Sequence, residues 1–428
     1  MPYNLSIWIK STAIVIIIPL IQTIAVAKNP VDRSSIVQVS NRDRQTAPVD
    51  KNNTKIAEQY YNSAEQKYNK KDYRGALADI NRAIQLKPDF ANAYRRRGVL
   101  KADKLQDVAG GLADINRSIQ IDPKNSKAYN SRGGLKVEKL RDIKGGLTDF
   151  DRAIQIDPKN AEAFSNRGIV KAMQKDYPSA LAAFNRAIQL KPDFATVYDN
   201  RGAIQAIGQN YRSALADFNR AIQFKPDLSH AYYNRGFLKE HKLQDPKGAL
   251  ADYDRAIQLS PRNVEIYVNR GTLKAEKLQD PKGALADFDR SIQINPKIAR
   301  AYTNRGLLKV DKLQDVKGAL ADYNRAIQLA PQDATSYKNR GALKVTKFQD
   351  LQGGLADFSR AIQFDPTDAH SYKNRALVKY DLNDKSGGIT DLTKAAKLFQ
   401  QQGNKQEAAA LLSVLKKWQK AKNTSPII

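Results

Sequence analysis

The chain has 428 residues, of which 41% are hydrophobic and 27% charged, and its formal net charge is +27. It contains no cysteine, which excludes disulfides and thiolate metal sites. Its three histidines leave little material for a histidine-based catalytic triad or a zinc site.

The first 27 residues have the pattern of a secretory signal peptide. Lys10 is the only charged residue before Lys28, and the apolar run between them ends in Ala25-Val26-Ala27. A basic start, a short apolar run and an Ala-x-Ala site favour cleavage after Ala27. The run is short for a membrane span, which needs about 20 apolar residues, so an uncleaved anchor is the alternative. Both interpretations place the rest of the chain outside the cytoplasm, in the periplasm or secreted, and only an anchor would contact the membrane.

A polar linker is predicted next, over residues 28–56. This stretch has no helical period and contains few apolar residues. Such segments bury too little apolar surface to order themselves, so we expect the linker to be flexible.

From residue 57 the sequence repeats itself every 34 or 35 residues. Prolines mark the period at positions 88, 123, 158, 192, 226, 261, 296, 331 and 366. A period of this length is typical of stacked supersecondary units. We divide the array 57–402 into the units 57–90, 91–125, 126–160, 161–194, 195–228, 229–263, 264–298, 299–333, 334–368 and 369–402.

The unit 264–298 shows why each repeat should be a pair of helices. Apolar and small residues recur every three or four positions in its first half, as one stripe of an α-helix. Asp280 is suited to cap a second helix, which Pro296 ends. Gly271 and Ala284 allow the two helices to approach closely. One pair cannot bury its own stripe, so neighbouring pairs must stack into a continuous core.

The repeats resemble tetratricopeptide repeats over about residues 57–402. The family's signature residues fall on Tyr302, Gly306, Ala319, Tyr323, Ala326 and Pro331. The resemblance implies an all-α fold: a right-handed α-solenoid of about ten stacked antiparallel helix pairs. A C-terminal capping helix is predicted over 403–421, followed by a tail at 422–428. The style of the units is similar to that of exported bacterial, including cyanobacterial, proteins.

Two departures from the family pattern carry further predictions. Most units have one additional residue in the first helix, between the glycine and the next leucine, where we expect a local bulge or overwinding. An arginine replaces the family's leucine before the glycine, at Arg132, Arg167, Arg201, Arg235, Arg270, Arg305 and Arg340. We predict that these arginines, together with the arginine three residues after the aspartate on the second helix (Arg290 after Asp287), form a structural ladder of ion pairs with aspartates such as Asp252, Asp287, Asp322 and Asp357. An anion-binding site is the alternative.

The repeat also accounts for most of the net charge. The unit 264–298 has six basic and five acidic residues, a net charge of +1. The total is then a modest excess copied many times. A basic surface that binds nucleic acid, or an anionic envelope polymer or lipid, is the alternative function. Pentatricopeptide proteins read RNA with similar units but lack the terminal proline and paired small residues, so no nucleic acid is expected.

The function implied by the resemblance is a non-catalytic scaffold that binds a peptide or protein partner in the concave groove. An asparagine lies two residues before the glycine in six units, and before Ala376 in a seventh, at Asn166, Asn200, Asn234, Asn269, Asn304, Asn339 and Asn374. In some family members a similar ladder grips an extended peptide, because an amide both donates and accepts. Hydrogen bonds between repeats are the alternative role.

One unit has unusual aromatic residues on the same predicted face. His230, Tyr233, Phe237 and His241 are spaced by 3, 4 and 4 residues, so they should project together. Aromatic anchors are typical of interface hot spots, whereas drift at variable positions is the alternative. No catalytic constellation, phosphate-binding loop or cofactor motif is recognisable, and we predict a protein that is not an enzyme and uses no cofactor or metal.

Overall fold

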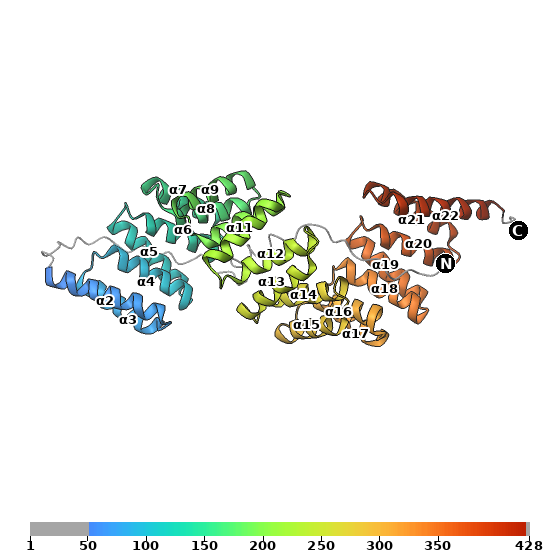
Figure 1. Cartoon of the computed structure of the whole chain (residues 1–428), viewed down its shortest axis with the longest axis horizontal. Helices are drawn as coiled ribbons and strands as arrows, with labels where there is room; N and C mark the ends of the chain where they lie inside the picture. The colour runs from blue at the N-terminus through green and yellow to red at the C-terminus, as the bar shows by residue number, and fades with distance from the viewer. Residues whose placement is uncertain (1–50, 425–428) are drawn as a thin grey trace. The chain divides into compact units, whose positions relative to one another are not determined.

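The computed structural model describes residues 51–424, with side chains from 52 to 420, and these residues form helices joined by short turns (Figure 1). The signal segment 1–27, the first part of the linker and the last four residues lie outside the described residues. The chain divides after Leu238 into two compact units. The fold is an all-α solenoid of helix pairs.

The first unit contains five helix pairs. They are α2 (Lys51–Asn69) with α3 (Tyr73–Leu86), α4 (Ala91–Lys104) with α5 (Val108–Ile121), α6 (Ser126–Glu138) with α7 (Ile143–Ile156), α8 (Ala161–Met173) with α9 (Tyr177–Leu190), and α10 (Ala195–Ile207) with α11 (Tyr211–Phe224). The even-numbered helix of each pair is called helix A below, and the odd-numbered one helix B. Helix α12 (Ser229–His241) contains the boundary between the units.

The second unit continues the same alternation. Its helices are α13 (Pro246–Leu259), α14 (Val264–Glu276), α15 (Pro281–Ile294), α16 (Ala299–Leu308) with the π-helix η1 (Lys309–Leu313), α17 (Val316–Leu329), α18 (Ala334–Phe348), α19 (Leu351–Phe364), α20 (Ala369–Asp381), α21 (Lys385–Gln401) and α22 (Lys405–Thr424). From residue 91 onward, each helix A begins at the first residue of a predicted repeat.

Residues close together in the chain determine where helix B begins and how closely helices A and B of a pair can approach. Asp280 caps helix B of the unit 264–298, because its carboxylate accepts a hydrogen bond from the backbone N–H of Gly283 (2.8 Å). Gly271 lies where helices A and B cross. A Cβ atom at this position would lie 2.8 Å from Cε1 of Phe288, a ring that is fully buried. The glycine is therefore required by the close approach of the two helices.

Each core cluster is shared by one pair and the next helix A. Val268 of α14, Phe288 of α15 and Leu308 of α16 pack together in the second unit. Consecutive helices A also contact one another, as α4 does with α6 and α14 with α16. This arrangement places helices A on the inner side of each stack and leaves one face of each helix B to solvent.

The additional residue of the 35-residue repeats widens the end of helix A. In α14 the Leu278 N–H donates to the oxygen of Leu273, five residues back (3.3 Å), and the Asp280 N–H donates to that of Lys274, six residues back (3.0 Å). In α16 the wide turn extends into the π-helix η1. The predicted bulge is present, but it lies after the leucine, at the end of helix A, and it is underwound and not overwound.

Two predicted boundaries are wrong. Residues 51–56 belong to α2 and not to the linker 28–56, because no proline or glycine stops the helix that the buried Ala57 anchors. The capping helix was expected over 403–421, with a tail from 422. It instead spans Lys405–Thr424, after a turn in which Gly403 has a φ of +78°.

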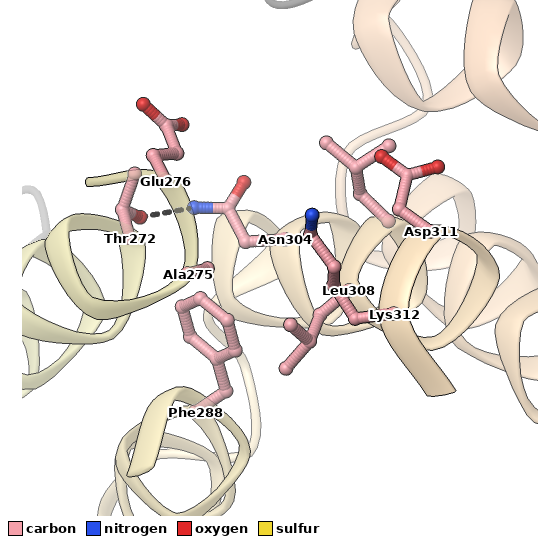
Figure 2. A pocket seen from close by; sticks show the side chains of 9 residues that line it. Thr272, Ala275, Glu276, Phe288, Asn304, Leu308, Asp311 and Lys312 are labelled. Atoms are coloured by element: carbon pink, nitrogen blue, oxygen red, sulfur yellow. Dashed lines mark hydrogen bonds between the residues drawn. The ribbon is translucent and has the colours of Figure 1, made fainter. Parts of the chain in front are cut away.

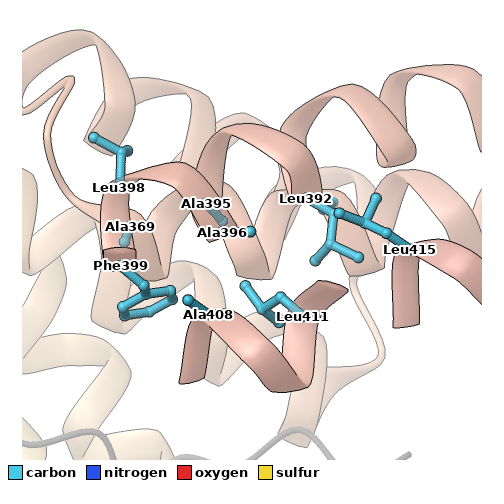
Figure 3. Close-up of a cluster of buried hydrophobic side chains, with 10 residues drawn as sticks. Ala369, Leu392, Ala395, Ala396, Leu398, Phe399, Ala408, Leu411 and Leu415 are labelled. Carbon is cyan, nitrogen blue, oxygen red and sulfur yellow. The ribbon is translucent and has the colours of Figure 1, made fainter. Parts of the chain in front are cut away.

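The last helix covers the end of the array. Leu411 and Leu415 of α22 pack against Leu392 and Phe399 of α21 (Figure 3). The Trp418 ring stacks on Tyr380 with centroids 3.8 Å apart. No helix in the described range 51–424 combines the length and apolarity that a bilayer span would need.

Candidate functional site

The arginines that precede the glycines form the predicted ion pairs with aspartates of helix B. Arg270 donates two parallel hydrogen bonds to Asp287, one of them 2.9 Å long from Nε, and a third to Asp254 of the preceding helix B (2.6 Å). Nζ of Lys274 lies 2.9 Å from the same Asp287 carboxylate. The guanidinium also lies over the ring of Tyr267, 5.7 Å from its centroid. These contacts tie helix A to the helices B on both sides of it.

The paired arrangement recurs along both units. Bidentate pairs join Arg97 to Asp114, Arg132 to Asp149, Arg201 to Asp217, Arg305 to Asp322, Arg340 to Asp357 and Arg375 to Asp391. Arg235 donates to Asn219 of the preceding helix B (2.7 Å), and Asp252 pairs with Lys239 (2.8 Å) in the second unit. Arg167 is the exception, because Ala183 occupies the aspartate position. These arginines are structural, as predicted. Arg290, which the same prediction placed in the ladder with Asp287, donates to Gln293 instead, so that part of the prediction is wrong.

The predicted asparagine ladder lies along helices A, and several of its members bond to the neighbouring repeat. Nδ2 of Asn166, Asn234 and Asn304 donates to Asn130 (3.0 Å), Asp199 (2.9 Å) and Thr272 (3.0 Å), respectively. Asn269 accepts a hydrogen bond from Arg300. Asn200 and Asn374 are half-buried, and the buried Nδ2 of Asn339 has no hydrogen-bond partner. The bonds favour the structural role for most of the ladder and leave the carbonyl oxygen of Asn304 for a ligand.

The predicted aromatic face of α12 is divided between the two units. His230, Tyr233 and Phe237 belong to the first unit, and His241 belongs to the second. Tyr233 is only 5% exposed, so it has little surface left for a ligand. Burial lowers the pKa of His230 and lowers that of His241 to about 4, so both imidazoles are neutral near pH 7. Tyr233 is therefore not an exposed anchor, and a binding role for His230, Phe237 and His241 stays a prediction.

A pocket opens on the inner face of the second unit, between α14 and α16 (Figure 2). Its floor is apolar and includes Phe288 and Leu308, and the hydrogen bond from Asn304 to Thr272 crosses one side. The remaining lining residues are Ala275, Glu276, Leu307, Asp311 and Lys312. A small apolar pocket with a polar rim is the usual form of an anchor site for one ligand side chain.

The rim of this pocket carries two carboxyl groups. Burial raises the pKa of Glu276 and that of Asp311 above their ordinary values. Asp311 and its neighbour Lys312 are carried by the π-helix η1, which changes the direction in which side chains leave the helix. Asn304 is the member of the predicted ladder that lines the pocket. The sequence did not indicate the pocket, because its residues come from α14, α15, α16 and η1.

Sequence analysis also missed a buried acid, Glu240. Its side chain is 1% exposed and accepts a hydrogen bond from the Tyr253 hydroxyl (2.7 Å). Burial raises its pKa to about 7. The signal was present in the repeat, because the equivalent residues are Ala275, Val310 and Val345. Within residues 51–424 no group of histidine, aspartate and glutamate side chains is placed to hold a metal ion.

Comparisons with known proteins agree with this geometry. Three models described as "Tetratricopeptide repeat" match residues 161–194, 229–263 and 273–334. No curated protein sequence matches the chain.

Several solved structures share the fold. The human IFIT1 dimer with m7Gppp-AAAA is 13% identical, with 84% of this chain and 90% of that chain covered and a TM-score of 0.53. The APC/C hetero-tetramer Cut9-Hcn1 is 14% identical, with 84% and 76% covered and a TM-score of 0.50. A protein from Parabacteroides merdae ATCC 43184 is 22% identical, with 60% and 98% covered and a TM-score of 0.48. At these identities the similarity concerns the fold alone.

Proposed function

We propose that this chain, which is a tetratricopeptide repeat protein, is a non-catalytic scaffold that binds an extended peptide segment of a partner protein along helices A. The pocket between α14 and α16 is the observation that carries the proposal. It lies on the inner side of the stack, where a segment running across successive helices A would meet it. The other face of helix A is occupied by the Arg–Asp ion pairs and the core.

The pocket indicates how such a peptide would be held. An aliphatic side chain would contact Leu307, Leu308 and Phe288, and its burial would be worth roughly 1.5–3 kcal/mol. Oδ1 of Asn304 would accept a hydrogen bond from the peptide backbone, since its Nδ2 is already bonded to Thr272. Glu276 and Asp311 would favour a basic residue beside the anchor.

Selection from a random peptide library would test the peptide site. We expect binders that lose at least tenfold in affinity on Leu307→Glu, which places a charge in the apolar pocket. Ala409→Glu is the matched control, because it adds the same charge to an exposed position of α22, away from the pocket and the helices B. Failure to select any binder, or binding unaffected by Leu307→Glu, would refute the proposed site.

Export is a separate part of the proposal and rests on the pattern of residues 1–27. Fused to alkaline phosphatase, which is active only after export, these residues should give an active enzyme in a bacterial host. The N-terminus of the exported full chain should be Lys28 if cleavage follows Ala27. A membrane-bound product that keeps its N-terminus would indicate the uncleaved anchor, and an inactive fusion would contradict export.

A further inference from the structure

A column of exposed arginines runs along the helices B. One arginine occupies the same position of helix B in nine successive repeats, namely Arg82, Arg117, Arg152, Arg186, Arg220, Arg255, Arg290, Arg325 and Arg360, and Lys394 occupies it in the tenth. Every one of these side chains is exposed. They lie on the solvent face of the helices, away from the inner side where the pocket opens, and five lie in each unit.

The arginines of the column differ from those of helix A in their partners, because within the described range they bond to neutral groups and not to carboxylates. Arg290 donates to the neutral Oε1 of Gln293 (2.6 Å), three residues later on the same helix. The same arginine–glutamine bond, 2.6–3.4 Å long, is formed by Arg82, Arg117, Arg152, Arg186, Arg255, Arg325 and Arg360. Among the described residues, no carboxylate pairs with any arginine of the column.

Basic residues accompany the column along the same stripe of helix B, whereas exposed aspartates beside it, such as Asp289, pair with an arginine of the next helix A. The stripe that contains Arg290 continues through Ala286 to Lys282, at intervals of four residues along the exposed face of α15. Six repeats have a basic residue at the position of Lys282, namely Arg74, Lys144, Arg212, Lys247, Lys282 and Lys317. At these stripe positions the ten helices B carry no acidic and no aromatic residue.

Simple copying of one ancestral unit does not explain the column. The position of Lys282 has diverged to alanine, proline, glutamine and serine in other repeats. The residue before the arginine varies among asparagine, aspartate, serine and threonine. The arginine persists in nine repeats although in eight of them its hydrogen bond is to a glutamine, and in the ninth Arg220 lies over the ring of Tyr198 (5.7 Å), so these contacts give it little structural value.

We propose that this arginine column is a second binding surface, which holds a linear carboxylated polysaccharide along the helices B of a unit. The planar guanidinium fork matches a carboxylate better than a lysine ammonium does. Each exposed ion pair is weak. Successive pairs made by one polymer chain nevertheless raise the overall affinity, because the chain holds its next carboxylate close to the next arginine. A single-stranded nucleic acid would require aromatic side chains on which its bases stack, and the stripe has none.

Binding of polygalacturonate oligomers of graded length to the full chain would test the proposal. We expect affinity to rise with oligomer length as more arginines are engaged, and to fall with added salt. Replacing Arg255, Arg290, Arg325 and Arg360 by glutamine should weaken binding of a long oligomer by roughly tenfold or more. The Arg→Lys version of the same four should bind less tightly than the wild type but more tightly than the glutamine variant.

Matched controls separate the column from net charge. Lys347, Lys405, Lys416 and Lys417, all exposed and outside the stripe, lose the same total charge when replaced by glutamine, and we expect less than a twofold effect. If both quadruple variants weakened binding equally, the proposal that the arginine column is the binding site would be refuted. If a single-stranded oligonucleotide of equal charge bound more tightly than polygalacturonate, the assignment of the ligand as a polysaccharide would be refuted. Loss of binding on Leu307→Glu would place the polymer on the inner face and so contradict the proposal.

Discussion

Two arginines of one repeat, twenty residues apart, show how differently the same side chain can be used. The side chain of Arg270 on helix A is 17% exposed. It pairs with two aspartates, one of which also pairs with a lysine, and it lies over a tyrosine ring. Arg290 on helix B is exposed and contacts Gln293. The first side chain holds neighbouring helices together, whereas the second leaves its charge to solvent or to a ligand. A count of basic residues cannot distinguish the two.

The repeat 161–194 provides an intermediate case within the same chain. Ala183 replaces the aspartate there, and Arg167 donates to the exposed Asp151 of the preceding helix B (2.8 Å). Its side chain is 34% exposed, twice the value for Arg270. The helix pair forms nonetheless. The ion pairs therefore add to a stack that core packing already defines, and their contribution should be measurable one repeat at a time.

The largest effect should come from Arg270→Ala. The change leaves Asp287, which is 3% exposed, with only Lys274 as a charged partner, and breaking a buried pair costs about 3 kcal/mol. Amide hydrogen exchange in α14 and α15 would measure the loss locally, because a long repeat array does not unfold as one two-state unit. Arg167→Ala, at an interface without the buried aspartate, should cost about 1 kcal/mol or less. Equal costs at both sites would contradict this account.

Glu240 is a buried carboxylate that accepts its hydrogen bond from a tyrosine hydroxyl instead of an arginine, so ionisation of this group should destabilise the fold. Burial raises the pKa of Glu240 to about 7, above its unfolded value of 4.5, with His241, Glu276, Lys277 and Arg300 nearby. The folded state therefore binds the proton more tightly, and stability should fall by about 3 kcal/mol as the pH rises from 4.5 through 7.

The matched variant for this titration is Glu240→Gln, which keeps the shape of the side chain and cannot ionise. Its stability should lack the decline between pH 4.5 and 7, and it should exceed the wild type at pH 8. Amide hydrogen exchange in α13, corrected for the intrinsic exchange rate at each pH, would compare the local stability of the two proteins. Parallel curves would show that Glu240 is not the group responsible.

Completing the ion pair at the deficient repeat should stabilise it. Ala183→Asp gives Arg167 the partner that the other repeats have, and Lys171 lies at the position that pairs with the same carboxylate elsewhere, so we expect a gain of about 1 kcal/mol. Hydrogen exchange in α8 and α9 would detect it. Ala182→Asp, one residue away on the exposed side of α9, is the control and should have little effect. A loss of stability on Ala183→Asp would indicate that burial of the charges outweighs their attraction.

The smallest effect on stability is expected for Arg290→Ala. It removes one hydrogen bond to an exposed glutamine, so the change should lie within about 0.5 kcal/mol. Hydrogen exchange in α15 gives the comparison with Arg270→Ala on the same repeat. A cost as large as that of Arg270→Ala would mean that the helix B column is structural, and would remove the reason for assigning it to a ligand.

Much of the fold could be predicted because a repeat multiplies each local signal. Asp280 as a cap, Pro296 as a stop and Gly271 at the crossing act within one unit, where spacing along the chain shows them directly. The partner of Arg270 was also predictable, since Asp287 is only 17 residues away on the paired helix. The first residues of α2 were missed because Lys51–Ile56 carry no apolar period and are ordered only by continuing an anchored helix.

The candidate site was harder to predict, because its residues belong to different repeats. Asn304 was identified by its position in the ladder, but its bond to Thr272 joins residues 32 apart, and the pocket beside it combines α14, α15 and α16. Tyr233 had the spacing of an exposed anchor and is buried. Spacing on one helix gives the direction of a side chain, but not what the next repeat places against it.

By itself the sequence determined the period, the paired helices, their ends and the ion pairs within a repeat, since these depend on residues close in the chain. Only the tertiary structure decided which charges are neutralised, where Glu240 is buried, how the π-helix presents Asp311 and where a pocket remains. These features arise where one repeat packs on the next. Their physical cause is that packing between repeats removes water from some side chains and leaves it around others of the same kind.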